Sequence, residues 1–312
     1  MANKEKNFAS AVIYVHNAEK RIERFLSTVI NTLESNFDHS EIICVNDSSI
    51  DNSLSVIKSV AQKAVSTSVS VVNMSYFHGL EVAMNAGMDL SIGDFVFEFD
   101  NTFLDFPEEK IMEIYKRSLQ GYDIVSAVPN KPEKLTSKLF YRVFDKFTDL
   151  PYEMHTESFR ILSRRVINRI SSMNKTIPYR KAIYASQGLK TDALKYEVIT
   201  TSEGKTDKTE RGYRSGLAVD SLILFTEMGY RFSMTMTAIM MLMSVFMVVY
   251  SIVIFVTQNP VAGWTTTILF LSVAFFGLFG ILTIVIKYLQ LLVNLVFKRK
   301  NYSFEGIEKL TK

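Results

Sequence analysis

Acidic and amide side chains stand at the ends of apolar segments in the first hundred residues. Asn17 follows one such segment, Asp47 follows a second, and Glu98 and Asp100 close a later one. Glu98 and Asp100 are two residues apart, so on a strand their side chains share a face, and Asp105 follows in the next loop. Carboxylates suit Mg²⁺ or Mn²⁺, and such an ion would let a nucleotide diphosphate approach them. Glu98, Asp100 and Asp105 are therefore the predicted metal ligands.

Alternating strand and helix patterns must position these side chains. The predicted strands are 11–15, 41–45, 69–73 and 94–99, and the predicted helices between them are 18–33, 54–64 and 78–90. Continuous apolar strands that alternate with helices indicate an α/β fold with a mostly parallel sheet and helices on both faces. Ligands bind such sheets beyond the carboxyl ends of the strands, where the polar side chains gather. One alternative stays open: Asp100 or Asp105 alone could cap a turn and the helix near Pro107.

Two long apolar runs near the C-terminal end predict a membrane hairpin. Residues 233–257 and 264–286 carry no charge, and each run exceeds the roughly 20 residues that span a bilayer. Arg231 precedes the first run, residues 298–300 (KRK) follow the second, and the connection between the runs has neither Lys nor Arg. This charge bias places both flanks in the cytoplasm. The alternative is that the runs are core helices of a soluble protein.

The hairpin divides the chain into five predicted parts. They are a cytoplasmic domain (1–216), a juxtamembrane amphipathic helix (217–232), two transmembrane helices (233–257 and 264–286) and a cytoplasmic interfacial tail (287–312).

Composition excludes several other classes of protein. The net charge of +3 is too small to indicate a nucleic-acid partner. The single cysteine, Cys44, cannot form a disulfide framework or a thiolate metal site, and the four histidines have no ligand spacing.

Several short motifs, in order along nearly the whole chain, resemble family 2 glycosyltransferases of the GT-A fold. The resemblance is closest to the polyprenyl-phosphate group, which includes dolichol-phosphate mannose synthases and undecaprenyl-phosphate glucosyltransferases with two C-terminal spans. The motifs are VHNAE (15–19), VNDSSID (45–51), GLE…NAG (79–87), IGD (92–94), DNTFLDFPE (100–108) and SFRILSRR (158–165).

This resemblance implies a membrane enzyme that moves a sugar from a UDP-sugar to undecaprenyl phosphate, with inversion, for cell-envelope glycans. It also implies dependence on Mg²⁺ or Mn²⁺, a place in the bacterial cytoplasmic membrane and a homo-oligomer. The catalytic residues that it implies are Asp100, Asp105, Ser158 and Arg160. The nucleotide-binding residues that it implies are His16, Asn17, Val45, Asp47, Asn101 and Thr102.

The chain departs from the family pattern at residues that carry the chemistry. The metal motif reads Asp100-Asn101-Thr102 where the family has two aspartates, and Ser158 replaces another aspartate. The acceptor phosphate has a second pKa of about 6 and is largely dianionic at neutral pH, so it needs little help from a base. The leaving diphosphate is different, because its charge must meet a metal or fixed cations.

A basic stretch before the first apolar run could supply such cations. Lys208, Arg211 and Arg214 align loosely with the family segment that contacts the diphosphate and the lipid phosphate. The alternative is a solvated basic loop attracted to anionic lipid. For the whole chain, the losses in the metal motif leave a second hypothesis, a catalytically degenerate binding or assembly subunit at the membrane.

Overall fold

The computed structural model describes residues 4–131, 156–172, 179–186, 188–199 and 304–311, together with single positions between 137 and 292. The strands are β1 (Ala9–Val15), β2 (Ser40–Asn46), β3 (Ser68–Met74), β4 (Phe95–Phe99), β5 (Ile124–Pro129), β6 (Phe159–Ser163), β7 (Thr191–Tyr196) and β8 (Phe304–Lys309). The helices are α1 (Glu19–Asn36), α2 (Ser53–Ala61), α3 (Leu80–Leu90), α4 (Glu109–Ser118), α6 (Arg164–Ser172) and α7 (Arg180–Ser186). The predicted strands and helices of the first hundred residues are thus confirmed within a few residues at each end.

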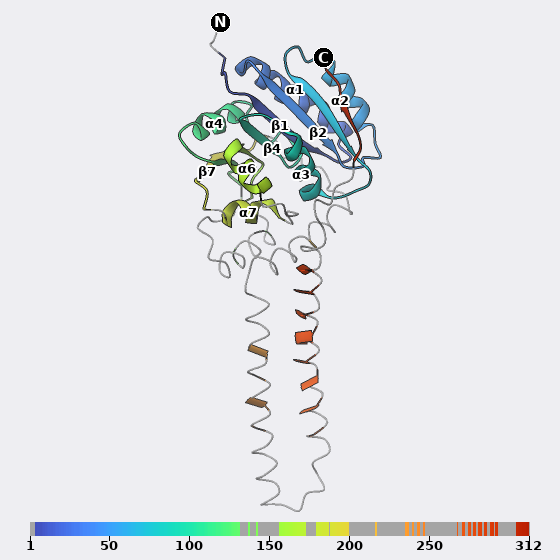
Figure 1. Cartoon of the computed structure of the whole chain (residues 1–312), viewed down its shortest axis with the longest axis vertical. Helices are drawn as coiled ribbons and strands as arrows, with labels where there is room; N and C mark the ends of the chain where they lie inside the picture. Colours follow the sequence, from blue (N-terminus) through green and yellow to red (C-terminus); the bar gives the residue numbers. More distant parts are fainter. Residues whose placement is uncertain are drawn as a thin grey trace, which may run out of the picture.

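The strands form one sheet in the order β7-β5-β6-β4-β1-β2-β3-β8. The central strands β4, β1, β2 and β3 are parallel, as predicted, and β5 and β7 are parallel to each other. β6 runs antiparallel to both β4 and β5, and β8 runs antiparallel to β3. Figure 1 shows this sheet within the domain, with β8 (red) at one edge of it.

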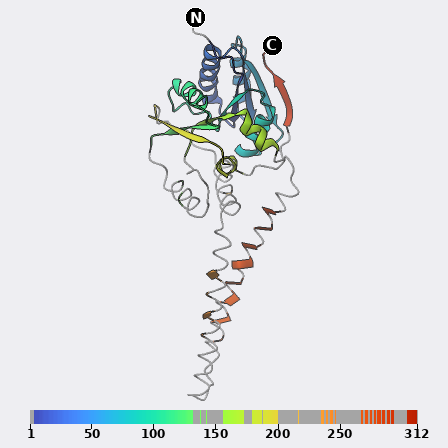
Figure 2. The ribbon, with the colours of Figure 1, turned by 60° about the vertical axis from the view of Figure 1, so that its left-hand side comes forward.

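Helices cover both faces of the sheet because alternate residues of each central strand point to opposite sides. Ala11 and Ile13 of β1 pack in a core that contains side chains of α1, α2 and α4. Val12 and Tyr14 of β1 pack in a second core with side chains of α3, α6 and α7. Figure 2, turned from the first view, shows α1 and α6 on opposite sides of the sheet.

Close packing of α3 on the sheet requires a glycine. A Cβ atom on Gly87 would lie 2.5 Å from Val12 Cγ1 and 2.7 Å from Val45 Cγ2. These distances are shorter than real contacts between carbon atoms, so a side chain at this position would push α3 away from β1 and β2. The start of α3 supplies part of the site, so this packing also fixes the site.

The C-terminal strand β8 was not predicted. Sequence analysis assigns residues 287–312 to an interfacial tail, whereas β8 pairs with β3 at the edge of the sheet. The Leu310 N–H donates to Val69 O at 2.8 Å, and the Val69 N–H donates to Thr311 Oγ1 at 2.8 Å. The chain therefore returns to the sheet after the apolar runs.

The predicted transmembrane helices and the juxtamembrane helix lie outside the described residues, except for single positions that are all helical. In the part of the chain that is described, no helix is both long and apolar enough to cross a membrane.

Candidate functional site

Two loops at the carboxyl ends of β1 and β2 are tied together by polar contacts. Asn17 and Ser48 have positive φ angles of 47° and 52°, which few residues other than glycine adopt readily. The Asn17 N–H donates to Ser49 Oγ at 3.1 Å, and Asn17 Oδ1 accepts from the Ile50 N–H at 2.9 Å. Asn17 therefore holds the two loops in register, and its carboxamide oxygen already has a protein partner.

Asp47, predicted to contact a nucleotide, is fully buried and positions the start of α3. Its carboxylate accepts from the backbone N–H groups of His78 and Gly79, each at 2.8 Å. A third hydrogen bond comes from the Tyr14 hydroxyl at 3.1 Å. Because these donors and the surrounding chain cover the carboxylate, Asp47 shapes the loop 75–79 rather than presenting a free acceptor to solvent.

Aromatic rings surround this loop. His16 packs against Phe77 with ring centroids 4.8 Å apart, and Tyr76 stacks on His78 at 3.9 Å. His16 Nδ1 also lies 2.7 Å from the backbone oxygen of Asp47. Tyr76 is 60% exposed, so this end of the sheet offers a flat aromatic surface on which a nucleobase could stack.

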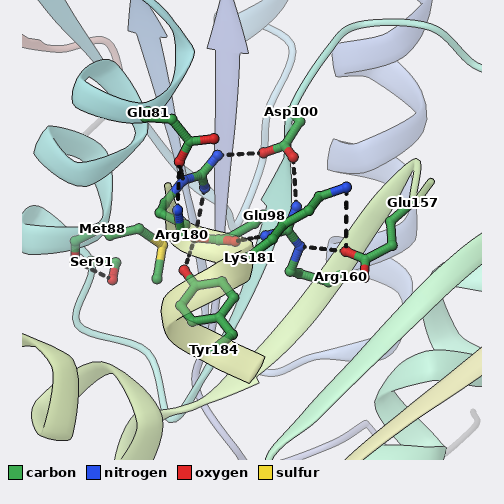
Figure 3. Close-up of polar contacts among 10 residues, drawn as sticks. All are labelled: Glu81, Met88, Ser91, Glu98, Asp100, Glu157, Arg160, Arg180, Lys181 and Tyr184. Atoms are coloured by element: carbon green, nitrogen blue, oxygen red, sulfur yellow. Dashed lines mark hydrogen bonds and ion pairs between the residues drawn. The ribbon is translucent and has the colours of Figure 1, made fainter. Parts of the chain in front are cut away.

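The end of β4 carries a buried network of ion pairs that sequence analysis did not predict (Figure 3). Asp100 accepts from two arginines, with Oδ2 2.6 Å from Arg160 Nη2 and Oδ1 2.7 Å from Arg180 Nη2. Arg160 comes from β6 and Arg180 begins α7, and each side chain is only 1% exposed. Both oxygens of Asp100 therefore have a cationic partner.

Each arginine also binds two other carboxylates. Arg160 lies 3.2 Å from Glu98 and 3.0 Å from Glu157. Arg180 lies 2.8 Å from both Glu81 and Glu98. Isolated guanidinium groups would be costly to bury, and these carboxylates provide the charge that makes the burial tolerable.

Glu98 is the innermost carboxylate of the network, with no exposed surface. Besides the two arginines, it accepts a hydrogen bond from the Tyr184 hydroxyl at 2.8 Å. Burial raises the pKa of Tyr184, and the neighbouring Glu98 carboxylate raises it further. Tyr184 therefore stays a neutral donor to Glu98.

The charges of the network settle its protonation. Burial by itself raises the pKa of Asp100, but attraction to Arg160 and Arg180 outweighs this effect and holds the pKa well below its ordinary value. Burial lowers the pKa of Arg160, and the nearby carboxylates, Asp100 first, more than reverse that. The carboxylate of Asp100 and both guanidinium groups are therefore charged at neutral pH.

Ser158 and Asp105 are brought together through a tyrosine. The Tyr196 hydroxyl donates to Asp105 Oδ1 at 3.0 Å and is hydrogen-bonded to the Ser158 hydroxyl. Lys131 Nζ lies 3.7 Å from Asp105 Oδ2. Burial, followed by the nearby Asp105 carboxylate, raises the pKa of Tyr196. Asp105 thus faces Tyr196 and Lys131, whereas Asp100 faces the arginines.

Three other predicted nucleotide-binding residues differ in what they can offer. The Val45 side chain is fully buried in the core between β2 and α3, which leaves its backbone for the predicted nucleotide contact. Thr102 is also buried. Asn101 Oδ1 accepts from the Phe103 N–H at 2.9 Å and closes a tight turn after β4.

The predicted phosphate-binding Lys208, Arg211 and Arg214 lie outside the described residues.

The described residues do not fit the predicted Mg²⁺ or Mn²⁺. Glu98 has no exposed surface, both oxygens of Asp100 are held by guanidinium groups, and Asp105 is hydrogen-bonded elsewhere. Across the described ranges, no group of three or more His, Cys, Asp or Glu side chains is arranged to hold a metal. The three predicted ligands therefore do not form an open ligand set in this structure.

A cavity beside the network is too small for a nucleotide. It is lined by Ser126, Glu157, Arg160, Lys181 and Tyr184 among others, and its volume of about 20 Å³ has room for roughly one water molecule.

Sequence analysis missed most partners of the network. Glu157, Lys181 and Tyr184 carried no motif signal, and neither did Tyr196 beside Asp105. Tyr184 lies four residues after Arg180 on α7, a spacing that places both on one face of the helix. That spacing was the one available signal, and it becomes meaningful once β4 is known to face α7.

Comparison with known proteins identifies the family. Residues 10–172, more than half of the chain, match the family "Glycosyl transferase family 2". An uncharacterised glycosyltransferase of Synechocystis is 29% identical over 203 residues, 63% of each chain. The bactoprenol glucosyl transferase of Shigella phage SfX is 28% identical over 280 residues, which cover 86% of this chain and 88% of that protein.

Among solved structures, glucosyl-3-phosphoglycerate synthase from Mycobacterium tuberculosis, in complex with Mn²⁺, UDP and glucosyl-3-phosphoglycerate, has a TM-score of 0.48 at 15% identity. The likeness covers 70% of this chain and 79% of that one. With its mostly parallel α/β sheet of the predicted GT-A type, the chain belongs to glycosyl transferase family 2.

Proposed function

We propose that this glycosyltransferase moves a sugar from a UDP-sugar to undecaprenyl phosphate, with inversion, at the cytoplasmic face of a bacterial inner membrane. One observation carries the proposal: the match to the bactoprenol glucosyl transferase runs over 280 residues. That length exceeds the predicted catalytic domain of residues 1–216, so the likeness extends into the apolar C-terminal runs. The relative's acceptor, a polyprenyl lipid by its name, becomes the proposed acceptor here.

Strand β8 supports the proposed hairpin. The chain leaves the sheet after β7, passes through both apolar runs and returns as β8 beside β3. A segment that starts and ends on one side of a membrane must cross it an even number of times. Two apolar runs, each longer than the roughly 20 residues that a bilayer requires, meet this condition.

Exposed apolar side chains along the second run and in the residues just after it also support a membrane location. Seven described helical positions recur at alternating intervals of four and three residues, which places them on one side of a helix. Each is between 44% and 55% exposed, which is unfavourable in water but natural in contact with lipid. They are Leu271, Phe275, Leu278, Leu282, Val285, Leu289 and Leu292.

The chemistry proposed is a single displacement. A phosphate oxygen of the lipid attacks the anomeric carbon while the bond from that carbon to the diphosphate breaks, and UDP leaves with the electron pair. Because the acceptor is largely dianionic at neutral pH, no described carboxylate has to remove a proton. Ser158, hydrogen-bonded to Tyr196, is therefore compatible with turnover.

A product assay tests the proposal. The purified full-length protein is incubated with undecaprenyl phosphate and a panel of nucleotide sugars, and lipid products are identified by mass spectrometry. We expect one donor to yield a lipid-linked sugar phosphate. Undecaprenol, which lacks the phosphate, is the matched control and should yield nothing.

Two other outcomes would argue against the proposal. A nucleotide sugar that binds without any lipid product would favour the assembly-subunit hypothesis. The ion pairs of Glu98 and Asp100 with arginines also favour that hypothesis, because they occupy the predicted metal ligands. Transfer to water or to another lipid would keep the enzyme class but replace the acceptor.

A further inference from the structure

The charges of the network around Asp100 are largely balanced, with one carboxylate in excess. Four carboxylates face three cations, and the cations lie within 4 Å of the carboxylates they neutralise. The carboxylates are Glu81, Glu98, Asp100 and Glu157, and the cations are Arg160, Arg180 and Lys181. Acidic side chains at the end of a strand would repel a diphosphate unless positive charge offsets them. Here the protein provides that charge from its own side chains.

The two arginines occupy the positions from which an ion would bind Asp100. Each carboxylate oxygen of Asp100 lies within hydrogen-bond distance of a different guanidinium. An ion at coordination distance from either oxygen would lie directly against one of these fixed cations. Repulsion between the two charges opposes divalent-metal binding, and the residues that the structure describes offer no second open carboxylate to offset it.

The arginines are also fixed in place. Each side chain is 1% exposed, and each is held by carboxylates from different elements. Arg180 bridges Glu81 of α3 and Glu98 of β4, and its own backbone N–H donates to Glu81 at 3.0 Å. To free Asp100 for a metal, Arg180 would have to leave Glu81 and Glu98, which are 4% and 0% exposed and so have little water to replace it.

We propose that this chain binds its nucleoside diphosphate without a divalent cation, because Arg160 and Arg180 do the charge-neutralising work at the end of β4. The proposal rests on the proposed function for the identity of the ligand. The arginines act as positioning residues: they are buried, and they act on the ligand by cancelling the charge of Asp100 and Glu98.

The first test uses Mn²⁺ alone with the full-length protein and needs no enzyme activity. Electron paramagnetic resonance of free Mn²⁺ during a titration should show no specific uptake. Stoichiometric Mn²⁺ binding that Asp100→Asn removes would overturn the inference.

The second test compares UDP binding in EDTA with binding in Mn²⁺. We expect dissociation constants that agree within about twofold, and UDP binding that is tighter by about tenfold or more in Mn²⁺ would overturn the inference. If UDP binds in neither buffer, the result counts against the proposed function, and the titration with Mn²⁺ alone still decides this inference.

A variant of Arg180 can free an oxygen of Asp100 for a metal ion. Arg180→Gln removes one cation and frees an oxygen of Asp100, so we expect measurable Mn²⁺ uptake that the wild-type protein lacks. Arg180→Lys keeps the charge and Arg165→Gln changes an exposed arginine outside the network, so neither should take up Mn²⁺. An Arg180→Gln protein that keeps its circular dichroism spectrum and still takes up no Mn²⁺ would contradict the role given to Arg180.

Discussion

Two acidic side chains at the same edge of the sheet are stabilised in opposite ways. Asp47, after β2, is held by a tyrosine hydroxyl and two backbone N–H groups. Asp100, after β4, is held by two guanidinium groups. Neutral donors fix Asp47 and leave its charge in place, whereas the arginines fix Asp100 and cancel its charge as well.

The difference also lies in the origin of the partners. Those of Asp47 come from the neighbouring βα units, His78 and Gly79 being about thirty residues away along the chain. Those of Asp100 come from β6 and α7, sixty and eighty residues later. A carboxylate at a strand end therefore does not by itself indicate a metal site, since its role depends on which elements fold against it.

The largest effect should follow from removing a cation of the Asp100 network. Arg160→Met leaves three carboxylates without one of their partners, and breaking a buried ion pair in this way costs about 3–5 kcal/mol. Thermal unfolding of the full-length protein should shift down by roughly 10 °C. Arg165→Met, at a side chain that is 73% exposed and pairs with Asp123, should shift thermal unfolding far less, because water screens the exposed charge. Equal losses for the two variants would refute the distinction.

Asp47→Asn should have a smaller effect, because it leaves no unpaired charge. The amide keeps one acceptor oxygen but turns an NH₂ group toward a backbone N–H, so about 2–3 kcal/mol of stability should be lost. Tyr14→Phe removes one of the three donors and should cost about 1 kcal/mol. Chemical denaturation of both variants measures these losses. A fully stable Asp47→Asn protein would show that the carboxylate does not hold the loop.

Acid should weaken the ion pairs of Asp100. Because the folded state lowers the pKa of Asp100, the ionised form contributes stability that is complete above its unfolded pKa of about 3.9 and is lost as pH falls below that value. Below pH 4, the wild-type protein should therefore lose up to about 1.4 kcal/mol per pH unit more than Asp100→Asn. Unfolding free energies at several pH values test this. Parallel curves for the two proteins would contradict it.

The contrast shows how much of the site could be predicted from sequence. The strands around Asp47 and Asp100 were predictable because buried parallel strands are continuous apolar runs with polar residues at their ends. The buried state of Val45 followed from the same pattern, although the family resemblance assigned it to a ligand. Those local signals correctly placed the carboxylates at one edge.

The partners of Asp100 could not be predicted in the same way. Arg160 lies in an apolar strand, and nothing in the residues around it says that β6 inserts antiparallel beside β4. Arg180 belongs to a short helix whose position is set by packing against α3 and β4. Strand β8 was missed for the same reason, because its backbone pairing with β3 leaves no periodic signal in six residues.

The smallest effect should come from an ion pair that looks equally strong. Lys58 Nζ lies 2.6 Å from Glu308 Oε2, the same distance as Arg160 from Asp100, but both side chains are more than 40% exposed. Water already solvates these charges, so Lys58→Ala should cost no more than about 0.5 kcal/mol. Hydrogen exchange should still protect the Leu310 amide, since its bond to Val69 is made by the backbone. Loss of that protection would mean that a surface ion pair holds β8 on the sheet, and that distance, rather than burial, ranks the ion pairs of this protein.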